Sequence, residues 1–389
     1  MSTSFKVDVA PAVLAWARHA AHLSKEDVGR KLAPKPDAVE RWTERVQAWE
    51  DGDEQPSLAQ LRNLAEVYRR PLPVFLLREP PVEPREAQDF RRPSEVGEMP
   101  PALAFAMREA RERREVATEL LGTDEARWSL SAEMSEPAED LAARIREALS
   151  VTFEAQRERG LAAWRDAAEA EGVLVFGFSG IESTTASGFA LTKGTDLPAI
   201  GLNNRDAPTR RVFTLLHELA HVTLRTEDVL CDLSDDSPAN AATERYCNHV
   251  AGAVAVPASA LLAHAVVVAH RGNTWSDAEV QKLARDFNVS REVIVRRLVL
   301  LGRTTQEHYR SWRARFRSDQ RDYEEKLEAG TGGPTHARKR VSQLGRRYVQ
   351  LVLSAADRER ISLSDASQYL GVKVDQFPSL VAELRGEAA

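Results

Sequence analysis

Apolar residues recur at three- and four-residue spacing through residues 10–77, a pattern typical of amphipathic helices. Prolines and a glycine interrupt this pattern and divide it into four or five short helices. The interruptions fall at Pro34, Pro36, Gly52, Pro56 and Pro71. Ser24 and Asp27 have the spacing of a capping box, and Ser57 precedes another apolar helix. We therefore expect residues 1–78 to form a compact helical bundle.

A proline-rich segment follows at residues 79–101, where six prolines stand among charged residues. This composition favours an extended linker of polyproline character. Beyond the linker, residues 102–121 and 137–168 have the apolar spacing of two charged helices.

Three short runs of strand-forming residues come next, at residues 172–178, 188–192 and 197–202. They predict a small three-stranded sheet. Two apolar helices follow, at residues 209–224 and 241–254, joined by an acidic loop at 227–236. From residue 275 the pattern is helical, with a glycine-rich break at residues 330–334.

These elements predict an α+β fold that is mostly α-helical. We expect the helical bundle and its linker to precede a middle domain at residues 102–272, which contains the sheet. Residues 273–389 are expected to form a helical C-terminal domain.

Composition narrows the classes of function. The 53 lysines and arginines are outnumbered by 59 aspartates and glutamates, so bulk electrostatic binding of nucleic acid is not expected. No apolar run approaches the length of a membrane span, and residues 1–11 lack a signal-peptide pattern. With only two cysteines in 389 residues, these features predict a cytoplasmic protein that binds no membrane.

The chemistry is concentrated in one helix, which carries the sequence His217-Glu218-Leu219-Ala220-His221. Two histidines four residues apart share a helical face, so both imidazoles can reach one metal ion at about 2 Å. Glu218 lies about 100° further round the helix, beside the ion's open position. The next helix offers a third ligand, for which we choose Glu244.

The alternative is a chance pair of histidines on a helix surface. The flanking residues are apolar, however, and would bury this helix, where unpaired polar groups are costly. The flanking residues are Phe213, Leu215, Leu216, Leu219, Ala220 and Val222. Burial together with a convergent acidic residue therefore favours a metal site.

Zinc at such a site favours peptide hydrolysis, with Glu218 as the base that takes a proton from water and passes it to the leaving amine. Imidazole and carboxylate ligands accept manganese and iron as well. The strand at residues 197–202 is expected to be the sheet edge that binds an extended substrate. Tyr246 and His249 follow Glu244 closely, and we interpret them as packing or solvent-facing residues rather than oxyanion stabilisers.

Thiolates are good zinc ligands, so both cysteines need an interpretation. Cys231 lies in the acidic loop and could occupy the open metal position, which would hold an enzyme latent. A plain, partly buried residue is the favoured reading for Cys231, and more strongly for Cys247.

Taken together, residues 207–221, Cys231-Asp232 and residues 244–257 resemble the ImmA/IrrE family of bacterial and phage metallopeptidases. The resemblance covers roughly residues 172–257 and makes the 102–272 region a metallopeptidase domain. It implies a zinc site with His217, His221 and Glu244 as ligands and Glu218 as the catalytic base. It also implies a helix-turn-helix repressor as substrate, whose cleavage switches on stress-response, defence or mobile-element genes. Residues 251–257 depart from the family in their small side chains, which affects packing rather than ligation.

The N-terminal bundle at residues 1–78 is similar to the Xre/Cro-type helix-turn-helix. This similarity implies DNA as a partner, although the expected recognition face carries three acidic residues beside three basic ones. These residues are Asp37, Glu40, Glu44, Lys35, Arg41 and Arg45. A bundle that holds a protein partner or covers the peptidase therefore remains an equal alternative.

The C-terminal region has two features that could suggest nucleic-acid binding. Residues 283–298 resemble a helix-turn-helix, but the pattern also occurs in plain bundles, which we favour. Residues 303–347 hold 12 basic and 6 acidic residues, including the cluster Arg338-Lys339-Arg340. Within that stretch Tyr309, Trp312, Phe316 and Tyr323 have the spacing of a core stripe, so a solvated basic face over a packed core is the favoured reading.

The leading hypothesis is a zinc-dependent metalloendopeptidase that cuts a regulatory protein. The first alternative is a DNA-binding transcriptional regulator whose peptidase domain acts as sensor or scaffold. The second is cleavage of this chain's own linker, which would release the N-terminal bundle.

Overall fold

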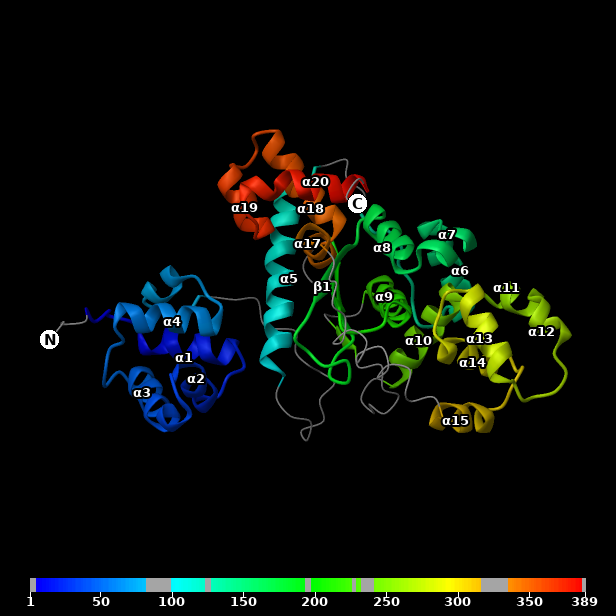
Figure 1. The fold of residues 1–389 in the computed structure, drawn as a ribbon, viewed down its shortest axis with the longest axis horizontal. Coiled ribbons are helices and arrows are strands. Elements are labelled where there is room, and N and C mark those ends of the chain that lie inside the picture. Colours follow the sequence, from blue (N-terminus) through cyan, green and yellow to red (C-terminus); the bar gives the residue numbers. More distant parts are fainter. Residues whose placement is uncertain are drawn as a thin grey trace. The chain divides into compact units, whose positions relative to one another are not determined.

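The computed structural model describes residues 5–81, 99–122, 127–192, 197–225, 229–231, 241–315 and 335–386 (Figure 1). The chain divides into two compact units. The first comprises residues 1–88 and 94–108, and the second comprises residues 89–93 and 109–389. Helix α5 (Pro101–Leu120) contributes its first part to the first unit and the rest to the second.

The first unit is a helical bundle, as the sequence predicts. Its elements are α1 (Pro11–Ala20), α2 (Lys25–Leu32), η1 (Pro36–Ala38), α3 (Val39–Asp51), α4 (Leu58–Tyr68) and η2 (Leu72–Leu76). Ser24 caps α2 in a capping box with Asp27, and Ser57 caps α4 in the same way with Gln60. The core of the bundle includes Leu14, Val28, Trp49, Leu61 and Phe75.

The second unit is built around a small sheet, with helices before and after it. The helices before the sheet are α6 (Ala138–Leu149), α7 (Phe153–Arg159) and α8 (Leu161–Ala170). The helices after its third strand are α9 (Pro208–Thr223), α10 (Ala241–Ala255), α11 (Ala258–Ala263), α12 (Ala265–Ala269), α13 (Asp277–Asp286), α14 (Arg291–Leu300) and α15 (Gln306–Arg315). The described C-terminal elements are α17 (His336–Leu344), α18 (Arg346–Asp357), α19 (Leu363–Leu370), η3 (Val374–Gln376) and α20 (Phe377–Arg385).

The sheet contains the three predicted strands and a short fourth one. They are β1 (Leu174–Phe178), β2 (Gly188–Leu191), β3 (Ala199–Asn203) and β4 (Val229–Cys231). Their order is β1-β3-β2-β4, with β1 parallel to β3 and the other pairs antiparallel. The expectation that residues 197–202 form a sheet edge is therefore wrong. Strand β3 pairs with β2 on one side and, in parallel, with β1 on the other. The end strands of the described sheet are therefore β1 and β4.

Helices cover both faces of this sheet. Val175, Ala190 and Ile200 face a core shared with Trp164 of α8 and Leu215 of α9. On the opposite face Phe176 contacts Tyr348 of α18, and the Arg113 guanidinium of α5 lies over its ring. Figure 1 shows α9 on one side of the strands and α5 with α17 on the other. Burial on both faces explains why the strands have continuous rather than alternating apolar residues.

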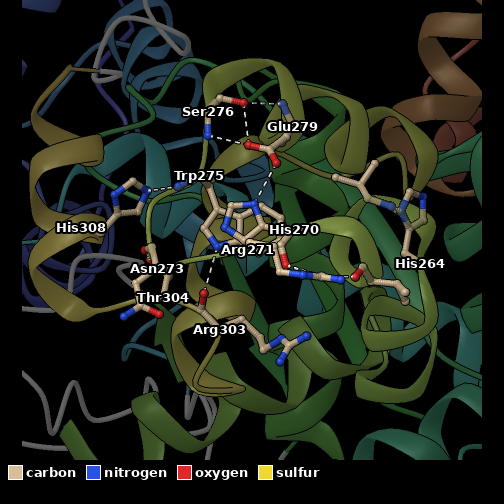
Figure 2. A network of polar contacts seen from close by, with 12 residues as sticks. His264, His270, Arg271, Asn273, Trp275, Ser276, Glu279, Arg303, Thr304 and His308 are labelled. Atoms are coloured by element: carbon tan, nitrogen blue, oxygen red, sulfur yellow. Dashed lines mark hydrogen bonds and ion pairs between the residues drawn. The ribbon is translucent and has the colours of Figure 1, made fainter.

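The hydrophobic core continues across position 272, where the sequence predicts a domain boundary. Val267, Trp275, Val280 and Ile294 belong to the same core as the buried residues of α9 and α10. Figure 2 shows how the connection is held: the His270 ring stacks on Trp275 with centroids 3.8 Å apart, and the Trp275 indole N–H donates to the Arg303 carbonyl at 3.0 Å.

The helices and aromatic residues of the C-terminal region pack into the core, while Arg338 and Lys339 of the basic cluster are exposed. Helices α13 and α14, predicted as a bundle with helix-turn-helix spacing, contribute Leu283 and Leu298 to the core. Tyr309 and Trp312 are buried, whereas Phe316, Tyr323 and the break at 330–334 lie outside the described residues. Arg340 of the basic cluster donates to the Leu370 carbonyl at 2.6 Å, at the C-terminal end of α19. None of the described helices is long and apolar enough to cross a membrane.

Candidate metal centre

Helix α9 carries the His-Glu-x-x-His motif through the interior of the second unit. Pro208 at its first turn suits a helix start, because proline lacks the N–H that would have no partner there. Its apolar residues pack on β2, β3 and α10, which buries the motif with them. His217, Glu218 and His221 have no solvent-exposed surface.

The imidazole rings of His217 and His221 converge on one position. Their Nε2 atoms lie 3.2 Å apart, and each lies close to the Glu244 carboxylate. The His217 Nε2 is 3.2 Å from Oε2 of Glu244, and the His221 Nε2 is 3.4 Å from Oε1. The structure therefore brings together the three residues that the sequence groups as ligands, which come from α9 and the first turn of α10.

Glu244 is held as a carboxylate by this arrangement. Burial alone would raise its pKa, but hydrogen bonds and charge interactions with His217 and His221 hold the pKa of Glu244 well below its usual range. Its side chain is 14 % exposed, so it is the most accessible member of the three.

The three donor groups suit a metal ion of intermediate softness, such as zinc. One ligand atom from each of the three residues can be chosen so that all lie within 4.8 Å of one another. Two imidazole nitrogens and one carboxylate oxygen form a ligand set of catalytic zinc sites, which keep a fourth position for water or substrate. Three converging polar groups in a buried place would be costly without a partner that uses them.

Glu218 lies where strand β2 meets α9, at Gly188. A Cβ added to Gly188 would lie 2.4 Å from Cγ2 of Thr214 and 3.2 Å from Oε1 of Glu218. Such contacts are too close for any side chain, so only glycine allows the strand to approach the helix here. Gly188 and Thr214 are not identifiable from the sequence, because a glycine at the start of a strand is too weak a signal alone.

Tyr246 and His249 are tied to α6 rather than to the candidate metal position. The Tyr246 hydroxyl donates to the Glu136 carbonyl at 2.8 Å, and the His249 Nε2 lies 2.9 Å from Glu139. Glu139 also accepts two hydrogen bonds from Arg297, at 2.6 and 3.1 Å. These contacts agree with a packing role, and they define an ionic network that the sequence analysis did not find.

The structure describes the side chain of Cys247 but only the backbone of Cys231. Cys247 is fully buried in the core. The backbone of Cys231 pairs with Gly188 across the β2–β4 ladder, while its side chain lies outside the description. The latency hypothesis for Cys231 therefore stays a prediction.

Comparison with known proteins supports the site's chemistry. Residues 168–299 match the family model of the IrrE N-terminal-like domain, a peptidase family designated M78. The match spans about a third of the chain and includes every residue of the candidate metal centre. No curated protein and no solved structure matches this chain. This match supports a metallopeptidase domain of the ImmA/IrrE type at residues 168–299.

Proposed function

We propose that this protein is a zinc-dependent metalloendopeptidase that cleaves a regulatory protein in a reducing, cytoplasmic compartment. The observation that carries the proposal is the convergence of His217, His221 and Glu244 beside a fully buried Glu218. His217, His221 and Glu244 would hold the metal, and Glu218 is not needed as a ligand.

When bound, zinc would supply a Lewis acid that polarises a peptide carbonyl and lowers the pKa of water. Glu218 accepts the proton of the attacking water and donates it to the leaving amine nitrogen. One C–O bond forms and the C–N bond breaks, so the proton ends on the new amino terminus. The Glu244 carboxylate keeps both imidazoles oriented toward one point.

The sheet suggests where an extended substrate would bind. Strand β3 cannot accept another strand, because it already pairs with β1 and β2. Strand β4 is the end strand on the side of β2, and β2 meets Glu218 at Gly188. We therefore place substrate addition at β4, where a peptide would extend the sheet through main-chain hydrogen bonds.

The substrate class is carried by resemblance alone, and we propose a helix-turn-helix repressor. New protein N-termini in cells that express wild-type protein or Glu218→Gln, before and after stress, test this proposal. A terminus that depends on Glu218 and lies in a repressor supports it. A Glu218-dependent terminus in this chain's own linker would instead support self-cleavage.

The second candidate function is a DNA-binding regulator that uses the peptidase domain as sensor or scaffold. It is favoured by the close crossing of α2 and α3 in the N-terminal unit, where a Cβ on Gly29 would lie 2.2 Å from the Thr43 hydroxyl oxygen. A tight helix pair of this kind is the core of a helix-turn-helix.

The charges of that unit argue against strong DNA binding. The Arg45 guanidinium lies over the rings of Trp42 and Trp49, at 5.2 and 5.9 Å from their centroids. Arg30 pairs with Glu26 and Asp27. A mobility-shift assay at low salt with the full chain decides the point, since sequence preference would support the regulator and its absence would favour a protein partner.

A further inference from the structure

A pocket separate from the candidate metal centre lies between α8 and α18 in the second unit. Its volume is about 380 Å³, within the range of small-molecule sites. Its walls also include Leu120 and Gly122 at the end of α5, and none of the four residues of the candidate centre.

Arginines dominate this pocket. Arg346 and Arg347 stand at the first turn of α18, and Arg358 and Arg360 at its other end. The lining contains two carboxylates, Asp166 and Glu169, so the pocket carries an excess of two positive charges. The whole chain has a net charge of −6, so the sign of this local excess is opposite to that of the molecule.

Both carboxylates are already engaged by other groups. Glu169 accepts from the Arg347 backbone N–H at 3.0 Å and from Arg165 at 3.3 Å. Burial raises the pKa of Glu169, while Arg165 and the Arg347 N–H oppose this shift. Asp166 forms an ion pair with Arg159, which does not line the pocket. Oδ1 of Asp166 also lies 3.7 Å from Nε of Arg346.

Main-chain carbonyls hold two of the arginines in place without neutralising them. Arg360 donates to the Leu120 carbonyl at 3.0 Å, and Arg346 donates to the carbonyls of Glu383 and Leu384. A guanidinium has five N–H donors, so each arginine retains others for a ligand. The Arg358 side chain has no hydrogen bond or ion pair with any residue in the described ranges.

We propose that this pocket binds a small phosphate-bearing anion. Guanidinium groups donate paired hydrogen bonds that match the oxygens of phosphate, and arginines line this pocket at both ends of α18. Helix α8 forms one wall and packs against α9, so the ligand would contact the helix layer that carries the metal site. Binding itself does not depend on the peptidase function proposed above.

Calorimetric titration of the full chain with inorganic phosphate, pyrophosphate and ATP tests the proposal. Each probe is used at constant ionic strength, with thermal unfolding as a second measurement, because a ligand that binds the native state raises the melting temperature. We expect saturable binding of at least one probe, and Arg358→Gln should weaken it about tenfold. Binding of phosphate and pyrophosphate alike would indicate an inorganic anion, and binding of ATP alone a nucleotide.

Arg271→Gln is the matched control. Arg271 is also exposed and in the second unit, and its side chain donates to the carbonyls of Val268 and His270, outside the pocket. Equal weakening by both variants, or no binding of any probe in the millimolar range, would overturn the proposal. Binding of oligonucleotides without these small probes would also overturn it.

Asp124 and Glu125 follow Gly122 in the sequence but lie outside the described residues. An Asp124→Asn, Glu125→Gln variant therefore completes the test. If a probe binds only to this variant, the chain's own acidic residues compete for the arginines, and the proposal of an exogenous ligand fails.

Discussion

Gly188 of β2 and Glu218 of α9 lie against each other so closely that a Cβ on the glycine would be 3.2 Å from the glutamate Oε1. This contact joins strand β2 to the part of α9 that carries the His-Glu-x-x-His motif. It also connects the strand next to the proposed substrate edge with the proposed catalytic base.

Gly188→Ala should therefore impair catalysis more than metal binding. The added methyl group would meet Thr214 and Glu218 and displace the carboxylate, and small misplacements of a catalytic group cost about 10²-fold. We expect a large fall in kcat with metal content close to that of the wild-type protein. Wild-type kcat in a folded Gly188→Ala protein would contradict the proposed placement of Glu218.

Removing the metal should destabilise the second unit. Three polar groups converge in a buried place, and an ion bound only in the native state stabilises that state. A chelator should lower the melting temperature, and added zinc should restore it. In Glu244→Ala the bound metal should fall well below one equivalent and the chelator should have little effect. A chelator response that persists unchanged in Glu244→Ala would show that the metal lies elsewhere.

Glu139→Gln should destabilise the protein through Arg297. The Arg297 side chain is 1 % exposed and donates twice to Glu139, so neutralising that carboxylate leaves a buried cation with weaker partners. We expect a loss of about 1–3 kcal/mol in the free energy of unfolding. Glu154→Gln on α7 is the control, because Glu154 is exposed and should change stability little. Equal effects of the two substitutions would contradict the importance of the network.

The same network predicts a dependence of stability on pH. Burial alone would raise the pKa of Glu139, but hydrogen bonds from Arg297 and His249 lower it below its ordinary value. A lowered pKa stabilises the native state above the unfolded value, and this contribution is lost as the pH falls through the folded pKa. Wild-type protein should lose stability in that acidic range more steeply than Glu139→Gln. Parallel curves for the two proteins would contradict this assignment.

The candidate site was predictable where its geometry is local or where two helices pair. His217, Glu218 and His221 share a helix, so their spacing alone places them together, and Glu244 follows from a second apolar helix. The pairing of strands that are far apart in the sequence was harder to predict. The parallel addition of β1 beside β3 makes β3 an interior strand, and the three-residue β4 is defined only by its partner β2.

Close contacts between distant segments escaped prediction for the same reason. Gly188 matters through what it touches, and Arg297 through a carboxylate 158 positions away. Neither has a local signature, since glycine at the start of a strand and arginine in a helix are both common.

The measurement that tests the central claim most directly is cleavage of a repressor by purified wild-type protein and Glu218→Gln, with bound metal determined on both. Both proteins should hold one equivalent of zinc, and the substitution should lower the cleavage rate about 10²- to 10⁴-fold, because it removes a general base without removing a ligand. Equal cleavage by the two proteins would contradict the account, as would wild-type cleavage that survives complete removal of the metal.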